Sequence, residues 1–230
     1  MLHSYLSHWD EVVIVLYYRR YYDMYSSQYR HLHDTGKLSE TIIQYFQKIL
    51  QRKTPPGKNY IAKKLLRKFE NVVIINYHDK RFRGSGESFY CHAMPNATHI
   101  CDAIKSEETK RDNARSSRQI DFQDLIHYAM DFKESDRNTA RKIAQKYLEE
   151  TKNLTMRKTC LDEDAKEKLL NKTLEFKQNV YPGDNEDELK SQFEKDVLTK
   201  LCTVDMDETL KDKAWKSFFQ SISKEYKGAK

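Results

Sequence analysis

The stretch EVVIVLYYRRYYDMYSSQYRHL, residues 11–32, decides how the first half of this chain folds. Residues 12–16 form an unbroken apolar run of mostly β-branched side chains. Because this run does not alternate with polar residues, it predicts a strand that is covered on both faces. The residues after it predict a helix with an apolar stripe formed by Tyr22, Tyr25, Tyr29 and Leu32.

The junction between this strand and this helix is a candidate ligand site. Arg19 and Arg20 stand where the strand must end, and Ser26 and Ser27 follow about two turns into the helix. Ligands of open α/β sheets bind beyond the carboxyl ends of the strands, near the amino ends of the following helices. The helix offers unpaired N–H groups there, and an arginine adds a planar fork of donors. The junction therefore predicts a phosphate-binding site.

A second strand is predicted at residues 71–77, NVVIINY, after a helix at residues 60–70. A strand, a helical crossover and a strand predict a βαβ unit with parallel strands, so this end of the chain belongs to the α/β class. The loop after the second strand is rich in cations, at Lys80, Arg81 and Arg83. It is either a second anion contact on the same rim or a solvated surface loop.

The remainder of the chain is predicted to be helical. Residues 106–119 form a polar connector, and helical periodicity continues from residue 120 to 230. Two capping signatures mark helix starts, Asn185 with Glu188 and Asp205 with Glu208, and the second of these helices is expected to continue to Ile222. We therefore expect an α/β region at 1–105 and a helical region at 120–230 that packs on it.

Two blocks of this sequence resemble sulfotransferases that use 3′-phosphoadenosine-5′-phosphosulfate (PAPS). Arg19, Ser27 and Tyr29 fit the register of the segment that binds the 3′-phosphate in that family. The blocks FENVVIINYHD, residues 69–79, and FYCHAMPNATHIC, residues 89–101, are similar to a region of uncharacterised algal sulfotransferase-like sequences. The resemblance covers residues 5–105 with motifs, and 120–224 only as a similar helical tail.

This resemblance implies a fold, a cofactor and a reaction. The fold is a partial P-loop-like parallel sheet with a long all-helical C-terminal part. Arg19 would contact the 3′-phosphate of PAPS or 3′,5′-adenosine diphosphate, and Ser27 would donate its hydroxyl to it. Other cofactor contacts that fit the pattern less well are Arg20, Ser26, Arg81 and Arg83. The reaction is transfer of a sulfuryl group to a hydroxyl or amine of an acceptor, such as a glycan, a protein tyrosine or a small molecule.

The loop that holds the 5′-phosphosulfate in this family does not occur in these 230 residues. The family places that K-x-G-T/S loop, and commonly its catalytic base, upstream of the arginine segment. The resemblance therefore implies that this chain is similar to the C-terminal two-thirds of a sulfotransferase domain, incomplete as an enzyme, with no catalytic residue assigned.

The cysteines and sequons bear on the cellular compartment. Four cysteines are disulfide candidates, Cys91, Cys101, Cys160 and Cys202, and the first two are close enough for a local bridge. Three asparagines stand in N-glycosylation sequons, Asn96, Asn153 and Asn171. These features, with the resemblance, predict the Golgi lumen or secretory pathway if a targeting segment lies upstream, whereas reduced cysteines in a cytosolic protein are the alternative. The Cys and His spacing at 91–101 does not fit a zinc site, so no metal is expected.

Charge and hydropathy limit the kinds of partner that this chain is expected to bind. The net charge is +6, from 41 basic and 35 acidic residues, which favours an anionic partner. These charges are spread along the chain and no nucleic-acid-binding motif occurs, so nucleic acid is not favoured. No apolar run is long enough to span a bilayer. A non-catalytic helical binding or scaffold protein that contacts an anionic partner remains as the alternative function.

Overall fold

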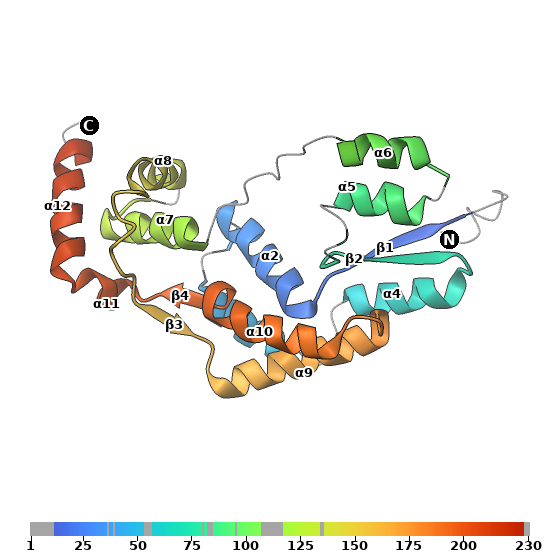
Figure 1. Cartoon of the computed structure of the whole chain (residues 1–230). Coiled ribbons are helices and arrows are strands. Elements are labelled where there is room, and N and C mark those ends of the chain that lie inside the picture. The colour runs from blue at the N-terminus through green and yellow to red at the C-terminus, as the bar shows by residue number, and fades with distance from the viewer. Residues whose placement is uncertain are drawn as a thin grey trace. The chain divides into compact units, whose positions relative to one another are not determined.

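The computed structural model shows a mostly helical α/β protein with one two-stranded parallel sheet and one short antiparallel strand pair (Figure 1). It describes residues 12–35, 37–38, 40–52, 57–79, 81, 85–94, 96–106, 117–133 and 136–227. Among these residues, no helix is long and apolar enough to cross a lipid bilayer.

The chain forms two compact units that are interleaved along the sequence. The first unit consists of Met1–Gln28, Lys48–Asn113 and Asp164–Phe193, and the second of Tyr29–Gln47, Ala114–Glu163 and Glu194–Lys230. Both units therefore draw residues from the predicted α/β part and from the predicted helical part of the sequence.

The helices and strands are distributed over these units as follows. The first unit contains β1 (Ile14–Tyr18), α4 (Gly57–Lys68), β2 (Val72–Asn76), α5 (Ser85–Ser88), the π-helical turn η1 (Phe89–Ala93) and α6 (Thr98–Ser106). The second contains α7 (Ser117–Ala129), α8 (Arg137–Tyr147), β3 (Lys158–Cys160), β4 (Cys202–Val204), α11 (Met206–Leu210) and α12 (Lys213–Lys227). Helices with residues in both units are α2 (Tyr21–Asp34), α3 (Ile42–Gln51), α9 (Glu163–Val180) and α10 (Glu186–Lys200).

The parallel sheet of the first unit pairs β1 with β2, in register from Ile14 opposite Val72 to Tyr18 opposite Asn76. This confirms the two predicted strands and their parallel direction. The expectation that the run at residues 12–16 is covered on both faces is wrong, because Val13 is 42% exposed and Ile14, Val15 and Leu16 are only half-buried. Successive side chains point to opposite faces of a strand, and at the carboxyl end of β1 Tyr18 is buried on one face while Tyr17 is 45% exposed on the other.

Aromatic side chains form much of the core of the first unit. The ring of Tyr18 lies 5.8 Å from that of Phe176 on α9 and 5.1 Å from that of Tyr181. Tyr22 on α2 is fully buried and packs edge-on against Phe193 of α10 at 5.1 Å. The predicted stripe of α2 is buried at Tyr22 and Tyr25 in this unit and at Tyr29 in the second unit, whereas Leu32 is half-buried. Burial of these large rings stabilises the helix against the strand that precedes it.

The second unit has a hydrophobic core of its own. Trp215 of α12 is fully buried, and its ring lies 5.7 Å from that of Phe122 on α7. The indole N–H of Trp215 donates a hydrogen bond to the Thr155 carbonyl oxygen at 2.9 Å, so this polar atom is satisfied. Ile143 and Ala144 of α8 complete the centre of this core.

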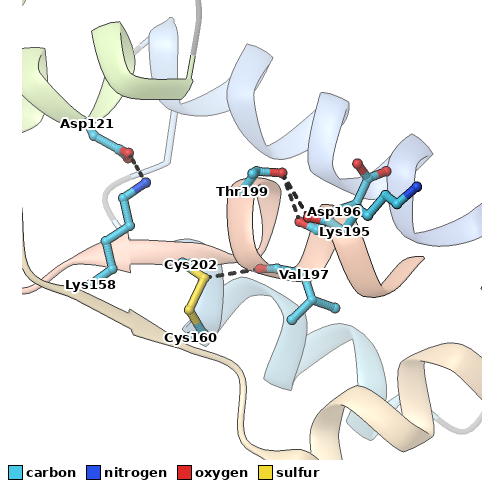
Figure 2. Close-up of a disulfide and its surroundings, with 8 residues drawn as sticks. All are labelled: Asp121, Lys158, Cys160, Lys195, Asp196, Val197, Thr199 and Cys202. Atoms are coloured by element: carbon cyan, nitrogen blue, oxygen red, sulfur yellow. Dashed lines mark hydrogen bonds and ion pairs between the residues drawn. A yellow bond between two sulfur atoms is a disulfide. The ribbon is translucent and has the colours of Figure 1, made fainter. Parts of the chain in front are cut away.

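Strands β3 and β4 correct the prediction of an all-helical C-terminal part. They pair in antiparallel fashion, with Cys160 opposite Cys202. Each strand has only three residues, which is too short for a period of two to be visible in the sequence. The disulfide Cys160–Cys202 joins the two strands across a sequence separation of 42 (Figure 2).

The other disulfide, Cys91–Cys101, confirms the predicted local bridge. It links η1 to α6 within the first unit and closes a segment with a sequence separation of 10.

The two capping signatures are confirmed. The Asn185 Oδ1 atom accepts the backbone N–H of Glu188 at 3.0 Å, and Asp205 Oδ1 accepts that of Glu208 at 3.0 Å. The helix after Asp205 ends earlier than predicted, because α11 stops at Leu210. Asp212 then accepts the N–H of Ala214 at 2.8 Å and starts α12.

Candidate functional site

The carboxyl ends of β1 and β2 meet at one edge of the parallel sheet. The Tyr77 N–H donates a hydrogen bond to the Tyr18 carbonyl oxygen at 2.9 Å, which continues the pairing to the last residue of β1. Arg19 and Arg20 follow β1 directly, and His78 follows β2. The edge where ligands bind in open α/β sheets therefore carries two arginines and a histidine.

Arg20 forms an ion pair within the protein. It is 2% exposed, and it donates from Nε to Asp184 Oδ2 at 3.0 Å and from Nη2 to Asp184 Oδ1 at 3.2 Å. Tyr18 donates its hydroxyl to the same carboxylate at 3.2 Å. Burial acts to lower the pKa of Arg20, but the hydrogen bond and the charge of Asp184 more than offset it, so the pKa is raised. Arg20 therefore acts as a buried structural cation.

Arg19 is held in a different way. Its side chain is 29% exposed, and its Nε donates to Asp23 Oδ2 at 2.5 Å, in the first turn of α2. The guanidinium carbon lies 4.6 Å from the centre of the Tyr77 ring, which places the cation over an aromatic face. Among the described residues, no acceptor is found for the two terminal nitrogens of Arg19. Arg19 is therefore oriented through Nε, and its two terminal nitrogens can donate to another acceptor.

The two serines of α2 differ as the two arginines do, because, among the described residues, one is hydrogen-bonded within the protein and the other is not. Ser26 is 2% exposed and donates its hydroxyl to the Tyr22 carbonyl oxygen at 2.9 Å. Ser27 is half-buried, and within the described part of the chain its hydroxyl has no hydrogen-bond partner. Asp23 and Ser27 are four residues apart, so they lie on one face of the helix, the face that begins at Arg19. The predicted pair Arg19 and Ser27 is thus accessible, whereas Arg20 and Ser26 are occupied.

His78 and Asp184 are site residues that the sequence reasoning missed. The His78 Nε2 atom accepts the backbone N–H of Arg20 at 3.2 Å and lies 3.8 Å from Asp23 Oδ2. Burial lowers the pKa of His78 to about 4, so the ring is neutral near pH 7. The position of His78 directly after a predicted strand was a usable signal. Asp184 had no such signal, because it lies in the loop between α9 and α10, far away in the sequence.

The cationic loop after β2 is only partly described. Arg81 is strongly exposed and forms a two-point ion pair with Asp79, from Nε at 3.0 Å and from Nη2 at 2.6 Å. The hydrogen bond from Arg81 lowers the pKa of Asp79. The predicted contact at Arg83 lies outside the described residues. The loop therefore adds one described arginine, which is already paired with a neighbouring carboxylate.

The modification candidates lie at the surface. Asn96, Asn153 and Asn171 are all exposed. Cys91 and Cys101 are bonded to each other, so they do not supply thiolates to a metal ion. The described residues contain no group of three or more His, Cys, Asp or Glu side chains arranged to hold a metal ion.

No protein-family model, no curated protein and no solved structure matches this chain.

Proposed function

We propose that this chain binds the 3′-phosphate of an adenosine 3′,5′-bisphosphate nucleotide, PAPS or 3′,5′-adenosine diphosphate, at the carboxyl end of β1. The observation that carries the proposal is the state of Arg19. Its Nε is bonded to Asp23 and its guanidinium carbon lies over the Tyr77 ring, while the terminal nitrogens have no acceptor among the described residues. A guanidinium held in this way is pre-organised for two parallel hydrogen bonds to a phosphate.

Ser27 supports the same assignment. Its half-buried hydroxyl lies on the helix face that starts at Arg19, and it can donate one hydrogen bond to a phosphate oxygen. The carboxylate of Asp23 opposes an incoming anion, but it is only 6% exposed and already shared with Arg19. Neutral His78 adds no positive charge to this rim near pH 7. We therefore expect weak, saturable binding that depends on Arg19.

The reaction that we propose for this nucleotide is sulfuryl transfer from PAPS to a hydroxyl or amine of a glycan or protein acceptor, on the strength of the sequence resemblance. In-line transfer also needs groups that hold the 5′-phosphosulfate and a base that takes the acceptor proton. These 230 residues contain no K-x-G-T/S loop for the first task. We propose that this chain by itself binds the nucleotide and does not turn it over, and that it acts in the secretory pathway.

Isothermal titration with 3′,5′-adenosine diphosphate tests the nucleotide site. We expect saturable heat for the wild type, and an affinity at least about tenfold weaker for Arg19→Ala, since hydrogen bonds to a charged group contribute about 1.5–3 kcal/mol. Adenosine 5′-monophosphate, which lacks the 3′-phosphate, should bind equally weakly to both proteins. Arg67→Ala is the matched control, because Arg67 is an exposed arginine on α4 of the same unit.

The alternative function is a non-catalytic binding module for an anionic partner. It is favoured by the independent core of the second unit and by the net charge of +6. The titration separates the two functions. A folded wild type that gives no saturable heat, or binding that survives Arg19→Ala, would reject the nucleotide site and favour the module.

A further inference from the structure

A second candidate site lies wholly within the second unit, away from the residues used above. It is a cavity of about 240 Å³ between the first turn of α7 and the segment that joins α8 to β3. The residues that line it are Arg118, Lys152, Asn153, Leu154, Thr155, Met156 and Lys158. Three of these side chains are cations and none is an acid, so the wall of the cavity is basic.

Arg118 is fixed at this wall without a carboxylate partner. Its Nη2 atom donates to the carbonyl oxygens of Thr151 and Leu154, the second at 3.0 Å. Its Nε atom is buried, and in the described part of the chain it has no hydrogen-bond partner. A buried donor without an acceptor costs free energy, so an oxyanion that accepts its hydrogen bond would be stabilised there. The positive charge of Arg118 is therefore held in place by neutral carbonyl groups.

The two lysines differ in how much of their positive charge is compensated by nearby carboxylates. The Lys158 ammonium lies 2.6 Å from Asp121 Oδ2, and this ion pair is drawn in Figure 2. Within the described residues, Lys152 forms its ion pair with Glu149, at 4.0 Å, and these two side chains are 65% and 86% exposed. An exposed pair at that distance compensates little charge. The Asp121 carboxylate also interacts electrostatically with Arg118, but its ion pair is with Lys158, so Arg118 and Lys152 are the less compensated cations of the cavity.

We propose that this cavity binds a tetrahedral oxyanion, a sulfate or phosphate group, either free or as the ester on a small sugar. The cavity is smaller than the 300–1,000 Å³ typical of drug-sized ligands, which suits such a group and the ring that carries it. Its donors also match, since two cations and the Thr155 hydroxyl can each donate to an oxyanion. This site shares no residue with the nucleotide site, and it does not depend on that proposal.

Two-dimensional NMR of the ¹⁵N-labelled chain, prepared with Asn153 unmodified, tests this site. The signals to follow are the Arg118 Nε–H and the backbone N–H groups of residues 152–156. Sodium sulfate and sodium phosphate should shift them along saturating curves, while sodium chloride at matched ionic strength should not. Lys152→Gln should weaken the fitted affinity about 3- to 10-fold, because it removes one charge-assisted hydrogen bond. Lys195→Gln, on exposed α10 surface outside the cavity, should leave the affinity unchanged.

Three comparisons decide the outcome. Equal shifts in sulfate, phosphate and chloride would overturn the proposal, as would an affinity that Lys152→Gln leaves unchanged. Arg19→Ala should not alter these curves, so failure of the nucleotide site and failure of this one are distinguishable. Glucosamine 6-sulfate and glucose 6-phosphate identify the source of the anion: tighter binding than the free ions supports an ester ligand, and equal binding supports the free ion.

Discussion

Arg20 and Asp184 are 164 positions apart in the sequence, yet they form a two-point ion pair in the interior of the first unit, at 3.0 and 3.2 Å. The pair joins the end of β1 to the loop between α9 and α10. The two arginines at the end of β1 therefore differ in role. Arg20 is bonded to Asp184 in the interior, whereas the side chain of Arg19 is 29% exposed.

Breaking this pair should destabilise the protein strongly. We expect Asp184→Ala to lower the free energy of unfolding by about 3–5 kcal/mol, because it leaves the Arg20 charge buried without a partner. Urea denaturation followed by circular dichroism measures this loss. Asp164→Ala is the control, since Asp164 pairs with Lys168 at the surface, and such a pair contributes less than about 1 kcal/mol. Equal losses in the two variants would contradict a structural role for the buried pair.

His78 should make stability depend on pH. Its pKa in the folded chain is about 4, below the unfolded value near 6.5, so the unfolded state binds more protons between these values. Its contribution is therefore complete above about pH 6.5 and is lost as the pH falls toward 4, by on the order of 2–3 kcal/mol. Denaturation at a series of pH values measures the slope.

Two variants isolate the effect of His78 on this slope. His78→Gln keeps an acceptor for the Arg20 N–H but does not titrate, so the slope should flatten. His92→Gln replaces an exposed histidine and should leave it unchanged. Direct titration of the His78 ring by NMR should place its midpoint well below 6, and a midpoint near 6.5 would refute the explanation.

The two disulfides should contribute unequally. Closing a longer loop restricts the unfolded chain more, so Cys160→Ser with Cys202→Ser should cost about 4 kcal/mol, and Cys91→Ser with Cys101→Ser about 3 kcal/mol. Denaturation of both double variants under oxidising conditions gives the ranking. Adding reductant to the wild type is the control, because it should lower stability by more than either variant alone. A wild type that is insensitive to reductant would show that the bridges do not form.

The sequons should be modified unequally in a chain directed to the secretory pathway. Asn153 and Thr155 are both exposed in the segment after α8, so the whole sequon is available to an enzyme. Asn171 is exposed on α9, but Thr173 is fully buried and donates to the Leu169 carbonyl oxygen at 2.7 Å. We expect fuller glycosylation at Asn153 than at Asn171, measured by peptide mass spectrometry. Asn153→Gln should remove one glycan, and equal occupancy at both sites would contradict the argument.

Local patterns in the sequence were sufficient to predict several features of the fold. The apolar runs predicted β1 and β2 and their parallel pairing, which the structure confirms. The caps at Asn185 and Asp205 were also predicted correctly. These features depend on neighbours within a few residues, through side-chain periodicity and local hydrogen bonds, so they can be read from the order of the residues.

The other features of the fold and of the site depend on contacts between residues that are far apart in the sequence. The sequence ranked Arg19 above Arg20 only by resemblance, whereas the accessibility of Arg19 follows from Asp184 taking Arg20. Strands β3 and β4, and the bridge between Cys160 and Cys202, likewise depend on segments 42 positions apart. The amino-acid sequence alone therefore determined the local elements and the candidate residues. Only the tertiary structure decided which charges are neutralised in the interior and which face solvent, because burial and ion pairing depend on segments that meet only in the folded chain.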